Sequence, residues 1–144
     1  MTETSMPAAL VEIVDDFQAL EEPERLQLLL EFSRNLPALP ERLANHPELL
    51  EQVVECQSPL FLTVEEDDDG GVQLYFSAPA EAPTTRGFAS VLHEGLNGRT
   101  RAEILAVPDD MPEKLGLMRA LTPLRLRGMS AMLGRIKRQL RALA

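Results

Sequence analysis

Cys56 is the single cysteine of this 144-residue chain, and it raises the main chemical question. One thiol cannot form an internal disulfide or supply the thiolates of an iron–sulfur cluster or a cysteine-rich zinc site. Pro59 favours an extended backbone at Ser58, which predicts that Cys56 lies on a loop or at a loop–strand junction. The acidic neighbour Glu55 favours the thiol over the thiolate. The residues alone therefore leave two interpretations open, a buried inert cysteine or a working thiol.

Two histidines and an acidic run are weaker candidates for chemistry. Cys56 and His93 have the residue types of a nucleophile and its base, but their spacing does not show that they meet. A solvent-facing or capping histidine is the simpler interpretation of His93, and His46 is given no role. The run Asp67–Asp69 lacks the alternating ligands and distal Glu of a calcium loop, so it indicates a solvated hairpin tip. We predict no metal site.

The charge of the chain is unevenly distributed. The first 83 residues carry 3 Lys+Arg and 18 Asp+Glu, and the remaining residues carry 11 and 5, so −15 and +6 sum to the net −9. An acidic total argues against a general nucleic-acid binder. The basic residues of the last helix indicate a solvated face that suits the helix dipole, or a surface for an acidic partner. These residues are Arg135, Lys137, Arg138 and Arg141.

The length suits one compact domain, and we predict a single domain over residues 1–144. The start, Met1–Met6, is polar and acidic and lacks the positive charge and apolar run of a secretory signal. No stretch approaches the roughly 20 apolar residues of a membrane span. We therefore expect a cytoplasmic protein without a membrane partner, in which a free thiol stays reduced.

Apolar periodicity predicts helices on both sides of a β-hairpin. The secondary structure of Leu49 to Val54 is ambiguous. Two glycines weaken the last helix, Gly128 and Gly134, and close packing against another element is the simplest explanation for them. The order predicts an α+β fold with helices on a small antiparallel sheet. We expect helices over 10–17 and 23–36, a loop with a helical turn over 37–47, strands over 60–64 and 72–77, and helices over 88–96, 100–105, from 110 and from 123.

Three segments together resemble the SufE family of cysteine desulfuration proteins. Residues 55–62, Glu-Cys-Gln-Ser-Pro-Leu-Phe-Leu, resemble its cysteine loop. Residues 85–88, Thr-Arg-Gly-Phe, are similar to its (Lys/Arg)-Gly helix start, and residues 121–129 to its Leu-Thr-Pro-x-Arg-x-x-Gly segment. The order and spacing of these segments and the helices around them match the family from Met6 to Ala142. The sequence as a whole is similar to that of an actinobacterial-type member.

The resemblance implies the fold shared by SufE and the U-type iron–sulfur scaffold proteins, a small antiparallel sheet flanked by helices. It implies a sulfur carrier rather than a stand-alone enzyme. Cys56 would take persulfide sulfur from a cysteine desulfurase of the SufS or CsdA type, stimulate that enzyme and deliver sulfur to an iron–sulfur scaffold complex. Pyridoxal phosphate belongs to the desulfurase, so the resemblance implies no cofactor of the chain's own.

The resemblance also implies roles for residues near the cysteine. Arg125 is the motif arginine, which would favour the thiolate or contact an acidic partner. Three positions depart from the family: Glu55 replaces a common Gly, Phe61 a common Trp and Pro79 a common acidic residue. The residues expected to contact the partner are Glu55, Gln57, Ser58, Glu81 and Arg86.

Two other classes of function stay open beside the sulfur carrier. A small cysteine-dependent enzyme would require a lowered thiol pKa and a His or Arg beside Cys56. A non-catalytic adaptor would bind through the basic last helix and leave Cys56 inert. The three classes differ in whether sulfur appears on Cys56.

Overall fold

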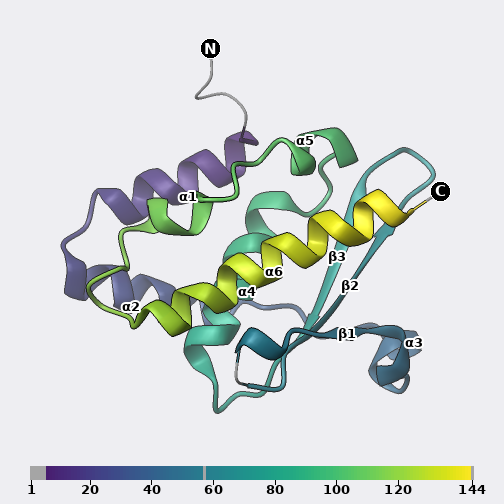
Figure 1. Cartoon of the computed structure of the whole chain (residues 1–144), viewed down its shortest axis with the longest axis horizontal. Helices are drawn as coiled ribbons and strands as arrows, with labels where there is room; N and C mark the ends of the chain where they lie inside the picture. The colour runs from purple at the N-terminus through teal and green to yellow at the C-terminus, as the bar shows by residue number, and fades with distance from the viewer. Residues whose placement is uncertain (1–5, 57, 144) are drawn as a thin grey trace.

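The computed structural model describes residues 6–56 and 58–143. Its elements form an α+β arrangement, as the sequence predicts, with one antiparallel sheet and helices before and after it (Figure 1). From the N-terminus they are α1 (Ala8–Gln18), α2 (Glu22–Ser33), α3 (Glu41–Ala44), the 3-10 helix η2 (Pro47–Leu49), β1 (Glu51–Gln52), the 3-10 helix η3 (Val54–Cys56), β2 (Phe61–Glu66), β3 (Val72–Ser77), α4 (Pro83–Leu96), α5 (Arg101–Leu105), the 3-10 helix η4 (Met111–Leu115) and α6 (Pro123–Ala142).

The sheet has the strand order β1-β2-β3, and both pairings are antiparallel. Leu62 pairs with Phe76 and Val64 with Leu74, so the buried side chains of β2 and β3 share one face. Gly70, with φ of +88°, supplies the left-handed conformation at the hairpin tip. The predicted hairpin is confirmed, and its apolar face is the side on which the helices pack.

Helix α4 packs against α1 and α2 through two glycines that allow close contact. A Cβ on Gly95 would lie 2.7 Å from the Cδ1 of Leu10, and one on Gly87 would lie 2.5 Å from the carbonyl oxygen of Leu29. The Arg-Gly pair at the start of this helix therefore serves packing at residue 87, because any larger side chain there would strike the backbone of α2.

Helix α6 runs across the molecule and ends near the hairpin tip (Figure 1). The Oγ1 of Thr122 accepts a hydrogen bond from the backbone N–H of Arg125 at 3.3 Å, and Pro123 begins the helix, as the sequence predicts. Apolar residues at helical spacing form the buried face of this helix. They are Met129, Met132, Leu133, Ile136 and Leu140.

Three local predictions are corrected by the structure. Helix α2 ends at Ser33, before the prolines that were expected to end it. The segment from residue 110 forms the short 3-10 helix η4, which ends at the left-handed Gly116 with φ of +71°. Gly134 has open space around the position of a Cβ, so close packing does not explain it, whereas Gly128 does lie against another segment.

Candidate functional site

Cys56 ends the short 3-10 helix η3, between β1 and β2. The backbone N–H of Val53 donates to the carbonyl oxygen of Leu60 at 2.9 Å, and both side chains are fully buried. The N–H of Cys56 donates to the carbonyl oxygen of Val53 at 3.1 Å. The cysteine therefore lies on a turn that is anchored at both ends in the core, which agrees with the predicted loop–strand junction.

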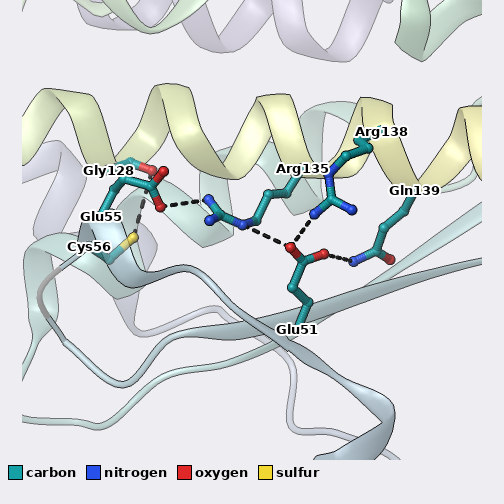
Figure 2. A network of polar contacts seen from close by, with 7 residues as sticks. All are labelled: Glu51, Glu55, Cys56, Gly128, Arg135, Arg138 and Gln139. Atoms are coloured by element: carbon teal, nitrogen blue, oxygen red, sulfur yellow. Dashed lines mark hydrogen bonds and ion pairs between the residues drawn. The ribbon is translucent and has the colours of Figure 1, made fainter.

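The thiol faces α6 at Gly128. The Sγ of Cys56 donates a hydrogen bond to the carbonyl oxygen of Gly128 at 3.6 Å (Figure 2). A Cβ on residue 128 would lie 3.2 Å from that Sγ and 3.3 Å from the Cα of Cys56. The glycine of the Leu-Thr-Pro-x-Arg-x-x-Gly segment thus lets the cysteine turn rest directly on the helix.

The surroundings of Cys56 favour the neutral thiol. Burial, together with the negative charge of Glu55, raises the pKa of Cys56 to about 11, while the charge of Arg135 acts in the opposite direction. The predicted effect of Glu55 is therefore confirmed. At neutral pH the free protein holds a protonated and weakly nucleophilic thiol.

A network of charged side chains joins the cysteine turn and β1 to α6 (Figure 2). Arg135 donates from Nη1 to Glu55 Oε1 at 2.6 Å and from Nε to Glu51 Oε2 at 3.0 Å. Glu51 also accepts from Arg138 and, at 2.9 Å, from the Nε2 of Gln139. Arg135 thus bridges two acidic residues that come from different segments of the chain.

The interpretation of the basic last helix as a solvated face is wrong for two of its four cations. Lys137 is only 5% exposed and donates to the carbonyl oxygen of Val107 and, at 2.7 Å, to Asp109 Oδ1. Arg135 is largely covered and occupied by Glu51 and Glu55. Arg138 and Arg141 are exposed, and Arg138 nevertheless pairs with Glu51. Acidic partners far away in the sequence neutralise much of this stripe.

The structure does not place Arg125 in contact with the thiol. Its side chain is exposed, and among residues 6–56 and 58–143 its guanidinium takes part in no hydrogen bond or ion pair. Arg125 precedes Gly128 by less than one helical turn, so it lies near the cysteine turn without bonding to it. Its role in partner contact stays a prediction.

The other predicted contact residues are dispersed. Arg86 donates to the carbonyl oxygens of Ala78 at 2.7 Å and Ser33 at 3.3 Å, which makes it a tie between α2, α4 and the end of β3. Glu81 is exposed, and Ser58 is half-buried in the cysteine turn. Gln57 lies outside the described residues.

The histidines and the acidic run form no further site. His93 is half-buried, which lowers its pKa, and lines a small cavity with Leu36 and Asn97 rather than facing Cys56. His46 pairs with Glu48 at 3.0 Å. Within the described ranges, no group of three or more His, Cys, Asp or Glu is arranged to hold a metal ion. In the same part of the chain, no helix combines the length and apolar character needed to span a membrane.

Two residues of the site were missed or misjudged from the sequence, namely Glu51 and Arg135. Glu51 lies in the segment whose structure the sequence does not define, and the basic pattern of the last helix indicates a solvated face for Arg135. The relevant signal would have been the register of β1 against β2, because that pairing turns Glu51 toward the helix that carries Arg135.

A cysteine turn that rests on a long helix beside a small antiparallel sheet defines an α+β protein with a single-thiol site. Residues 11–140 match the family SufE, described as an Fe-S metabolism associated domain. The chain belongs to the SufE family, which works in iron–sulfur metabolism and sulfur transfer and generally partners with cysteine desulfurases. The resemblance found in three short segments is confirmed at the level of the family.

Relatives and a solved structure match over nearly the whole chain. An uncharacterized SufE-like protein of Mycobacterium tuberculosis is 58% identical over 137 residues, which cover 95% of this chain and 94% of that protein. SufE-like protein 1, chloroplastic/mitochondrial, of Arabidopsis thaliana is 31% identical over 89% of this chain and 33% of that longer protein. The solution structure of a hypothetical protein from Thermus thermophilus has a TM-score of 0.82 and 39% identity, and covers 95% of this chain and 96% of that chain.

Proposed function

We propose that this protein accepts sulfur on Cys56 from the persulfide of a cysteine desulfurase, stimulates that enzyme and passes the sulfur to an iron–sulfur scaffold. The observation that carries the proposal is the position of Cys56. The only cysteine of a SufE-family chain lies on an anchored turn, in direct contact with the motif glycine Gly128.

The transfer is a thiol exchange without net oxidation or reduction. Cys56 loses its proton to solvent or to the leaving group, and its thiolate attacks the outer sulfur of the donor persulfide. A new S–S bond forms at Cys56, the S–S bond of the donor breaks, and the donor cysteine leaves as a thiolate. We propose no cofactor for this chain, because the pyridoxal phosphate that generates the persulfide belongs to the desulfurase.

The raised pKa of Cys56 fits a carrier better than a free-standing thiol enzyme. An enzyme nucleophile needs a substantial thiolate fraction or an adjacent base, whereas the charge of Glu55 opposes the thiolate and His93 faces elsewhere. A carrier meets its donor only inside a complex, where the partner changes the surroundings of the thiol.

The surface around the thiol offers contacts for the desulfurase. Val54 is 62% exposed and belongs to the turn that carries Cys56, and Leu124 is 42% exposed, one turn of α6 before Gly128. Arg125 adds a cation beside Leu124. This combination favours a partner with apolar side chains and a carboxylate near its own persulfide.

The test is sulfur transfer followed by intact-mass measurement. The protein is incubated with a SufS-type desulfurase and L-cysteine in the absence of a reductant. We expect the mass to rise by one or more sulfur atoms, and we expect Cys56→Ser to show no gain and to lose the stimulation of turnover. Stimulation that survives in Cys56→Ser would favour the adaptor, and an unmodified wild-type protein would overturn the carrier.

A further inference from the structure

We propose that the ion pair between Arg135 and Glu55 is a latch that holds the cysteine turn on α6, and that opening this pair exposes the thiol. The latch is a property of the free protein. Only the statement that a desulfurase opens it rests on the proposed function.

The two carboxylates that Arg135 binds, those of Glu51 and Glu55, differ in how many other side chains hold them (Figure 2). Glu51 is fixed by three side chains of α6, namely those of Arg135, Arg138 and Gln139. Glu55, among the described residues, has Arg135 as its side-chain partner. Arg135 is therefore anchored on the Glu51 side through Nε, and its Nη1 binds Glu55 of the cysteine turn.

The other contacts between the cysteine turn and α6 are weaker. The hydrogen bond from the Sγ of Cys56 to Gly128 has a length of 3.6 Å, and a thiol is a weak donor. Val54 points away from the core and is largely exposed. Among the described residues, the charge-assisted bond of 2.6 Å between Arg135 and Glu55 is thus the strongest side-chain hydrogen bond between the turn and the helix.

The latch uses a position at which this chain departs from the pattern of the family it resembles. Glu55 stands where the resemblance places a common Gly, and a glycine has no carboxylate to offer to Arg135. The Glu at position 55 therefore does more than change the surface that a partner meets. It pairs with Arg135 of α6, which lies 80 positions later in the chain.

The latch and simple electrostatics predict opposite results for one substitution. Arg135 lowers the pKa of Cys56, so loss of its charge alone would slow alkylation of the thiol. Loss of the latch would free the turn and accelerate alkylation. Arg135→Gln therefore separates the two explanations by the direction of the change.

The experiment measures alkylation of the free protein by iodoacetamide at constant pH. We expect Arg135→Gln to react about fivefold faster than wild type, which corresponds to the loss of one partly covered ion pair. Arg138→Gln is the matched control, because Arg138 touches Glu51 but not Glu55, and we expect it to stay within about twofold of wild type. An unchanged or slower reaction of Arg135→Gln would overturn the latch.

Amide hydrogen exchange gives a readout that does not depend on the thiol. Exchange over the cysteine turn is expected to accelerate in Arg135→Gln and to stay unchanged in Arg138→Gln. If Arg135→Gln does not fold, Glu55→Gln serves instead, because it removes the carboxylate of the latch and leaves the bond of Arg135 to Glu51 in place. Wild-type exchange over the turn in whichever variant folds would contradict the proposal.

The role of the partner is tested separately. A desulfurase without L-cysteine should accelerate alkylation of Cys56 more in wild type than in Arg135→Gln, since the latter is already open. Equal acceleration of the two proteins would show that the partner does not act through the latch. The carrier function would still stand, because sulfur uptake is measured independently by mass.

Discussion

The two halves of α6 carry four and two cations and use them differently. In the C-terminal half, residues 133–142, Arg135 and Lys137 are covered and engaged by acidic residues or carbonyl oxygens, and Arg138 pairs with Glu51. In the N-terminal half, residues 123–132, Arg125 and Arg127 are exposed, and within the described residues no hydrogen bond or ion pair engages their guanidinium groups. The basic residues of α6 therefore do not form one continuous exposed surface. Cations of the C-terminal half join α6 to distant segments of the chain, whereas those of the N-terminal half stay exposed.

The largest expected effect concerns the thiol that lies between these two regions. Because burial and Glu55 raise the pKa of Cys56 from 9.0 to about 11, the thiolate is the minor form throughout the neutral range. Alkylation should accelerate about tenfold per pH unit, or roughly a thousandfold between pH 7 and pH 10, without a plateau. Rates of iodoacetamide labelling followed by mass spectrometry measure this profile. A plateau below pH 9 would mean that the C-terminal network activates the thiol instead of leaving it protonated.

The next largest effect is expected at the two glycines of α6. Gly128→Val places a branched side chain 3.2 Å or less from the Sγ of Cys56, and we expect the free energy of unfolding to fall by about 2 kcal/mol. Gly134→Val is the matched control, since open space surrounds that position and the change should stay within about 0.5 kcal/mol. Urea denaturation measures both. Equal losses of unfolding free energy at the two positions would show that the close contact between Gly128 and Cys56 does not matter for stability.

The smallest effect tests which half of the helix meets the partner. Arg125→Glu reverses an exposed charge beside the thiol, and we expect about tenfold more protein to be needed for half-maximal stimulation of the desulfurase. Arg141→Glu makes the same change in the C-terminal half, at an exposed position, and should leave stimulation unchanged. A titration of desulfurase turnover with each variant gives the answer. If Arg141→Glu has the larger effect, the docking surface lies at the other end of α6.

The elements that the sequence predicts well are those fixed by neighbouring residues. Alternation of apolar side chains defines β2 and β3, and Thr100 with Glu103 forms the capping box of α5 as their spacing indicates. The start of α6 at Thr122 and Pro123 follows from the same local chemistry. In these cases the decisive contacts lie within a few positions, so a pattern in the chain is enough.

The parts that the sequence does not predict depend on contacts between distant segments. Lys137 is buried because Asp109 and the carbonyl of Val107 lie above it, and neither is visible from the pattern of α6 alone. Glu55 appears in the sequence only as an acidic neighbour of Cys56, while its pairing with Arg135 depends on how η3 packs against the helix. One segment of the sequence is thus enough to identify Cys56 as the candidate thiol. The ion pair that holds the cysteine turn on α6 cannot be predicted from that segment.

The hydrogen bond between Val53 and Leu60 limits how far the thiol of Cys56 can move. Both residues are fixed in the core, so Cys56 stands on a tether of six residues, and even a fully opened turn carries it only about 10 Å from its base. In the sulfur transfer proposed above, so short an arm would not reach a donor sulfur that lies deeper than this distance below the surface of its protein. The proposal therefore requires a donor whose sulfur lies at or near the surface, and the distance between the two cysteines would depend mainly on how closely the two surfaces fit.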